Sequence, residues 1–218
     1  MNTQKNVFWQ ALIVALIMFN LGVFMGYMLE KNRINKIDTL YAESELQFLD
    51  IRALADISYL KNVNCSFAVK ENIKFADKIY EEAKILQRYE DASRISDALI
   101  LRHKKYDLLR TQVWINSIRL KEMCAVDYKN VVYLYEYSKD ISIELKAKQD
   151  IFSRKLVEVK EKLGWKMLLL PVAGNNNLSS IDLLKIQYNI TELPAILIDE
   201  KAKIVMIEEV GQIESYLN

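Results

Sequence analysis

The stretch YNITELPAILID, residues 188–199, places Pro194 directly before a short run of apolar residues. Proline has no N–H to give to a sheet, so within sheets it is confined to edges, bulges and the first residue of a strand. The run 195–199 therefore predicts a buried strand that the chain enters through a special backbone position at Leu193 and Pro194.

The region around this stretch, 125–218, alternates between strand and helix patterns. The string VVYLY at 131–135 is typical of a buried strand, and Gly164 is a natural end for a helix that starts near Asp140. The other expected elements are a strand at 165–172, a short helix at 181–188, a strand at 204–209 after a turn at Glu200 and Lys201, and a helix at 212–217. The predicted order is β-α-β-α-β-β-α, which makes this region an α/β domain.

The region 30–124 predicts a helical stalk or bundle. No proline or glycine occurs between Ile37 and Cys124, and apolar residues recur at helical spacing. A polar break at 61–64 separates the first two helices, and a third is expected at 91–123. Their apolar stripes comprise Leu40, Leu46, Leu49, Leu54, Ile57 and Leu60, then Phe67, Ile73, Ile79, Ala83 and Leu86, then Ile95, Leu99, Tyr106, Leu109, Val113 and Ile118. Because none can bury its stripe alone, the helices should pack as antiparallel neighbours.

Charge and composition argue against several classes of partner. With 30 basic and 29 acidic residues, the chain has no overall field that would attract nucleic acid. His103, the single histidine, lies in the basic run 102–105, which predicts a solvated helix face. No second histidine or cluster of cysteines accompanies it, so we expect neither a metal site nor a cofactor.

The segment 7–29, VFWQALIVALIMFNLGVFMGYML, follows a six-residue tail and contains no charged residue. Its length predicts a transmembrane helix in contact with membrane lipid. A cleaved signal peptide is the competing interpretation, but the apolar run is long for one and no small-x-small cleavage site follows it. Gly22 and Gly26 form a GxxxG pair that would let a second helix approach, and Asn20 could donate a hydrogen bond between helices. Homodimerisation through this segment or the stalk helices remains open.

The sequence contains conflicting signals about which side of the membrane holds the bulk of the chain. Lys31, Arg33 and Lys36 follow the apolar segment, which by the positive-inside rule would place the bulk of the chain in the cytoplasm. Against this, Cys65 and Cys124 make an even pair suited to a disulfide, and glycosylation acceptor patterns begin at Asn64, Asn177 and Asn189. We favour the extracytoplasmic side for the bulk of the chain.

The element order and the position of Pro194 resemble the thioredoxin fold, in which a cis-proline at this place faces the helix that carries the active site. The string Tyr188 to Ala195 is similar to the tyrosine-x-valine-x-x-x-proline segment common in that family. Over nearly its whole length the chain resembles archaeal membrane-anchored thioredoxin-like proteins, which have one N-terminal span and a helical region with two isolated cysteines. This resemblance implies a cis Leu193-Pro194 bond.

The chain departs from redox-active thioredoxins where their Cys-x-x-Cys motif opens the helix after the first strand. Ile141 and Glu144 occupy the two thiol positions, so this looks like a degenerate member of the family in which dithiol exchange cannot occur. Asp140 is interpreted as the helix cap and Glu144 as a favourable charge in the first helical turn. The sequence therefore predicts a non-catalytic domain.

Two functional hypotheses follow from the resemblance. In the first, the domain is a binding or scaffold module that holds an extended peptide beside Leu193 and Pro194, with Ile141 and Ile143 as apolar contacts. In the second, the protein is a membrane-bound thiol-disulfide oxidoreductase that uses Cys65 and Cys124, although their spacing matches no redox motif. The family resemblance favours a structural disulfide for this pair, while a cytoplasmic location would favour two buried free thiols.

Overall fold

The computed structural model describes residues 2–58, 64–91, 97–207 and 210–217, and within parts of the helices it describes the backbone alone. Contacts divide the chain into two compact units, Met1–Glu43 and Ser44–Asn218. The expected boundary between stalk and C-terminal domain, at residues 124 and 125, falls inside the second unit. Each unit is therefore described by itself.

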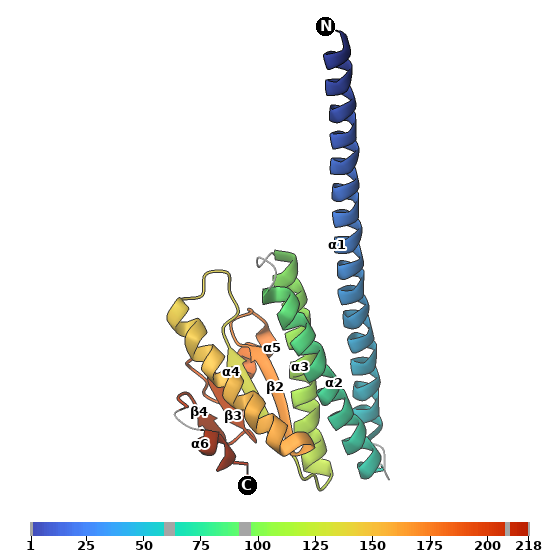
Figure 1. Cartoon of the computed structure of the whole chain (residues 1–218). Coiled ribbons are helices and arrows are strands. Elements are labelled where there is room, and N and C mark those ends of the chain that lie inside the picture. The colour runs from blue at the N-terminus through green and yellow to red at the C-terminus, as the bar shows by residue number, and fades with distance from the viewer. Residues whose placement is uncertain (1, 59–63, 92–96, 208–209, 218) are drawn as a thin grey trace. The chain divides into compact units, whose positions relative to one another are not determined.

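Helix α1, Asn2–Ser58, is a continuous helix of 57 residues (Figure 1). Its segment Trp9–Lys31, 23 residues with a mean hydropathy of 2.2, is long and apolar enough to cross a membrane. The apolar segment and the first expected stalk helix thus share one helix, because no proline interrupts the pattern.

Helices α2, Cys65–Asp91, and α3, Asp97–Met123, lie side by side (Figure 1). Residues 61–63 of the predicted break, and 92–96 at the start of the predicted third helix, lie outside the described residues. The disulfide between Cys65, at the start of α2, and Cys124, just past the end of α3, shows that the two helices run antiparallel. This matches the expected packing of neighbours.

The apolar stripes are buried only in part. In α3, Tyr106, Leu109 and Val113 are buried, as expected. Leu46, Leu49 and Ile57 of α1, and Phe67 of α2, are exposed, so the expectation that they face a core is wrong. Helical periodicity identifies an apolar face but does not say whether that face finds a partner.

The second unit contains a four-stranded mixed sheet in the order β2-β1-β3-β4. Its strands are β1, Lys129–Tyr135, β2, Met167–Ala173, β3, Ala195–Ile198, and β4, Ala202–Ile204. Strands β1 and β2 are parallel, whereas β3 runs antiparallel to both β1 and β4. The coarse prediction of a mixed α/β region is confirmed.

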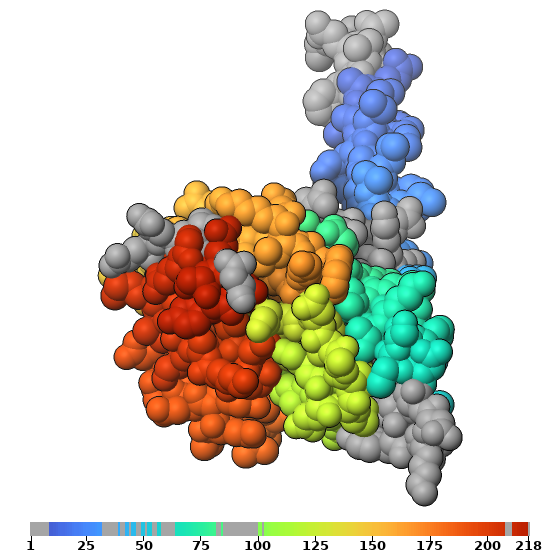
Figure 2. Space-filling view, turned by 90° about the horizontal axis from the view of Figure 1, so that it is seen from below, coloured from blue at the N-terminus to red at the C-terminus, as the bar shows by residue number. Residues whose placement is uncertain are grey.

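Helices cover both faces of this sheet. The helices that follow the strands are α4, Ile143–Leu163, α5, Ser179–Gln187, and α6, Val210–Glu214, and a short 3-10 turn, Gly164–Lys166, follows α4. Phe152 and Leu156 of α4 and Ile213 of α6 share one core with Val131 and Tyr133 of β1. Helix α3 packs against β1 and β2, and Figure 2 shows its yellow-green residues against the red C-terminal ones. Side chains alternate along a strand, so the opposite face of β1 meets α3.

Several predicted boundaries shift. Helix α4 begins at Ile143, three residues later than expected, and β2 begins at Met167 because the 3-10 turn occupies 164–166. Strand β4 covers 202–204, earlier than the predicted 204–209, of which 208 and 209 lie outside the described residues. The last helix covers 210–214 in place of 212–217.

Candidate functional site

Three segments meet at one end of the sheet. Tyr135 at the end of β1 lies opposite Ala173 at the end of β2, and Leu134 lies opposite Ala195, the first residue of β3. The loop after β1, the loop after β2 and the Leu193-Pro194 segment therefore converge at this end. We call this place the proline end of the sheet.

The Leu193-Pro194 bond is cis, as predicted. Pro194 is buried, while Leu193 is half-buried. The Leu193 side chain packs over Gly174, since a Cβ at Gly174 would lie only 3.0 Å from Leu193 Cδ2. Among the described residues, no hydrogen-bond partner is recorded for the Leu193 backbone N–H or C=O.

Two side-chain amides fix the loop after β1. The backbone N–H of Glu136 donates to Gln149 Oε1 at 2.7 Å, and Gln149 Nε2 donates to the Glu136 carbonyl at 3.1 Å. Asn175 repeats the pattern on Tyr137, accepting from its N–H at 2.8 Å and donating to its carbonyl at 3.2 Å. Each side-chain amide bonds both the N–H and the C=O of one loop residue, as a neighbouring strand would. Gln149 therefore holds the loop to α4, and Asn175 holds it to the loop after β2.

His103 is buried, so the prediction that it lies on a solvated helix face is wrong. It is 7% exposed, not on a solvated face, and its ring stacks on Tyr137 with centroids 3.7 Å apart. Its Nε2 lies 2.8 Å from the hydroxyl of Tyr135. The basic neighbours of His103 suggested a surface, whereas its helical spacing with Tyr106 and Val113, both buried, is the signal that could have placed it inward.

A buried charged cluster lies beneath this stack. Asp107, fully buried, contacts Arg110 at 3.3 Å and His103 at 3.5 Å, and it accepts a hydrogen bond from the side-chain amide of Asn176. Burial raises the pKa of the Asp107 carboxyl, and the charges of His103 and Arg110 oppose that shift. The Asn176 side-chain amide, which donates to Asp107, joins this cluster on α3 to the loop after β2.

The two positions that the sequence comparison placed opposite the thiols of redox-active thioredoxins, Ile141 and Glu144, lie at the start of α4. Ile141 is half-buried, and Glu144 is exposed in the first helical turn. Ile143 is 90% exposed. Ser142, not Asp140, caps the helix, because its side chain accepts the N–H of Leu145 at 3.1 Å.

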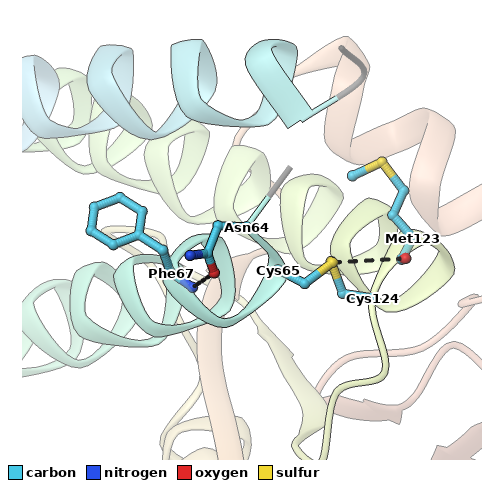
Figure 3. Close-up of a disulfide and its surroundings, with 5 residues drawn as sticks. All are labelled: Asn64, Cys65, Phe67, Met123 and Cys124. Atoms are coloured by element: carbon cyan, nitrogen blue, oxygen red, sulfur yellow. Dashed lines mark hydrogen bonds between the residues drawn. A yellow bond between two sulfur atoms is a disulfide. The ribbon is translucent and has the colours of Figure 1, made fainter. Parts of the chain in front are cut away.

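Cys65 and Cys124 form a disulfide with an S–S distance of 1.99 Å and a Cα–Cα distance of 5.6 Å (Figure 3). Beside it, Asn64 Oδ1 accepts the backbone N–H of Phe67 at 3.1 Å (Figure 3). Cys124 follows the end of α3, whereas His103 lies near the start, so the two are about 30 Å apart at the rise of an α-helix. The disulfide is therefore remote from the proline end.

The remaining candidate residues lie on α1, at the start of α2, in the loop after β2 and after α5. Gly22 and Gly26 are on α1, where an added Cβ would meet no heavy atom within 4 Å. Asn64, Asn177 and Asn189, which begin the acceptor patterns, are all exposed. No cluster of three or more potential metal ligands occurs among the described residues.

Comparison of the chain with protein-family models, with curated proteins and with solved structures gives no match. Function is therefore argued from the site itself.

Proposed function

We propose that this chain is a membrane-anchored, non-catalytic protein of the thioredoxin-like class that binds an extended peptide at the proline end of its sheet. The observation that carries the proposal is the Leu193 backbone, which lies just before β3 and has no hydrogen-bond partner among the described residues. An extended peptide can pair with such groups as an added strand. The element order β-α-β-α-β-β-α, with Pro194 at the entry to β3, supports the thioredoxin-like assignment.

The opposite edge of the sheet is closed to an added strand. Lys160 Nζ donates to the Met167 carbonyl at 2.7 Å, and Arg110 Nη1 donates to the Pro171 carbonyl at 2.6 Å. Pro171 has no N–H to offer, and α2 packs against β2. Natural sheets protect their edges in these ways, so the β2 edge is an unsuitable place for peptide addition.

The absence of catalysis is inferred from the positions of the thiols and their state. Ile141 and Glu144 stand where redox relatives carry cysteines, and neither side chain can form a mixed disulfide. The chain's two cysteines are bonded to each other at the far end of α3, where Cys65 is half-buried and Cys124 is 5% exposed. Thiol-disulfide exchange requires access to a sulfur atom, which favours a structural role for this pair.

The proposed anchor is the apolar segment of α1, with the second unit on the extracytoplasmic side. The disulfide supports this side, because such bonds persist in oxidising compartments. Labelling of intact cells with a membrane-impermeant maleimide tests it. We expect labelling of Cys65, which is half-buried, only after an impermeant reductant has been added. Labelling that requires cell lysis would contradict the proposed side.

Peptide binding is tested by placing a photo-crosslinking amino acid at Ile143 in the full chain. The matched control is the same substitution at Ile186 of α5, which is 77% exposed. We expect adducts from position 143 only, with the linked partner segment mapped by mass spectrometry as extended chain. Equal adduct formation from both positions, or none from either, would contradict a peptide groove beside Pro194.

A further inference from the structure

Asn20 is a polar residue at the centre of the apolar segment Trp9–Lys31. If this segment spans the membrane, as proposed above, the Asn20 amide lies near the midplane, where an unsatisfied polar group is most costly. Its Nδ2 donates one hydrogen bond to the Leu16 carbonyl at 2.7 Å. An amide that makes this bond still has a second N–H and the lone pairs of Oδ1.

The face around Asn20 has the pattern of a helix-packing seam. Ile13, Leu16, Ile17, Asn20, Leu21 and Phe24 line one shallow hollow on α1. Within this face, Ile13, Ile17, Asn20, Phe24 and Tyr27 follow alternating steps of four and three residues. That spacing is the seam of a left-handed helix pair, in which side chains of one helix fit between those of the other.

We propose that a second copy of this chain covers the Asn20 face and forms a parallel transmembrane homodimer. Copies inserted with the same orientation place Asn20 opposite Asn20 across a two-fold axis. One remaining N–H and one Oδ1 on each side then form a reciprocal pair of hydrogen bonds. A second copy supplies a matching amide at the same depth, whereas an apolar helix would leave these groups unpaired.

The GxxxG pair predicts a different interface. At 3.6 residues per turn, Gly22 lies roughly 160° and Gly26 roughly 120° around the helix from Asn20. The glycines therefore lie outside the Asn20 seam. Substitutions on the two faces separate the two possible dimers.

The test uses the full chain, labelled with donor and acceptor dyes at the N-terminus and reconstituted in phosphatidylcholine vesicles over a series of lipid dilutions. Energy transfer between dyes gives the dimer dissociation constant. We expect Asn20→Leu to raise this constant by about 5- to 30-fold, the range of interhelical amide bonds in membranes. Asn20→Gln should keep the dimer, because it keeps the amide.

One control completes the design. The double variant Gly22→Leu, Gly26→Leu blocks the glycine face and should leave the dissociation constant unchanged. An unchanged constant for Asn20→Leu, a monomeric wild type, or dissociation of the glycine variant would overturn the Asn20 interface. Failure of the wild type to enter vesicles would instead contradict the membrane anchor, and carbonate extraction of the vesicles distinguishes this outcome from the others.

Discussion

Asp199 and Glu200 are neighbours in the turn between β3 and β4, but their surroundings shift their pKa values in opposite directions. Burial raises the pKa of Glu200, although Trp114 and Asn130 donate hydrogen bonds to its carboxylate. At Asp199 burial acts in the same direction, but the hydrogen bonds from Lys121 and the Asn130 N–H outweigh it, so its pKa is lowered. The turn therefore contributes two opposing pH dependences to stability.

Glu200→Gln should stabilise the protein at neutral pH. The raised pKa means that the folded state binds the Glu200 proton more tightly, so this contribution is present below pH 4.5 and is lost as pH rises through the folded pKa. Glutamine keeps an oxygen for Trp114 and Asn130 without the charge. Urea unfolding in detergent micelles should show a stability gain at pH 7 that disappears near pH 4.

The matched variant Asp199→Asn should behave in the opposite way. The lowered pKa of Asp199 contributes stability above its ordinary value of 3.8, which is lost as pH falls through the folded pKa. Asparagine tolerates the positive φ of 50° at this position. The same urea measurement should show a loss at pH 7 that shrinks in acid. A common sign for both variants at pH 7 would contradict the two assigned shifts.

At the scale of single elements, two polar residues near the start of α4, Ser142 and Asp140, should differ in their effect on stability. Ser142→Ala should destabilise the protein by about 1 kcal/mol, because the N–H of Leu145 loses its cap. Asp140→Ala, at an exposed position outside the helix, should change stability by less than about 0.5 kcal/mol. Thermal unfolding of the two variants side by side measures the difference. A larger loss of stability for Asp140→Ala than for Ser142→Ala would mean that Asp140 caps the helix.

The disulfide joins α2 to α3 across a sequence separation of 59 residues. By the chain-entropy account, the double variant Cys65→Ser, Cys124→Ser should lose roughly 4 kcal/mol of unfolding free energy. Denaturant unfolding of this variant, of the wild type and of the reduced wild type measures the loss. We expect the double variant and the reduced wild type to agree. Equal stability of all three would mean that the bond does not stabilise this helix pair.

The sequence predicted the kind and order of elements better than their surroundings. Runs such as 131–135 and 195–198 identify strands because residues buried on both faces are continuously apolar. The burial of His103 was not predictable from its basic neighbours, because the residue that covers it, Tyr137, belongs to another element. The pairing of Asn175 with Tyr137 was missed for the same reason. The sequence around a loop asparagine does not show which backbone groups its side chain will bind.

At the scale of the whole molecule, the proposed membrane anchor and the proposed peptide site lie in different units. The apolar segment was evident from composition alone, because a run of this length has few other uses. The proline end became visible only when the register of β1 with β2 and β3 brought three loops together. Each property can therefore fail without the other, and the proposed interface at Asn20 depends only on the first.

The central claim, a thioredoxin-like domain without redox catalysis, is tested most directly by the reduction of insulin with dithiothreitol as the electron donor. The purified full chain in detergent micelles should not accelerate insulin reduction above the rate with dithiothreitol alone, because Ile141 and Glu144 provide no thiol. The Cys65→Ser variant should give the same background rate. Turnover by the wild type that Cys65→Ser abolishes would contradict the account and assign catalysis to the Cys65–Cys124 pair.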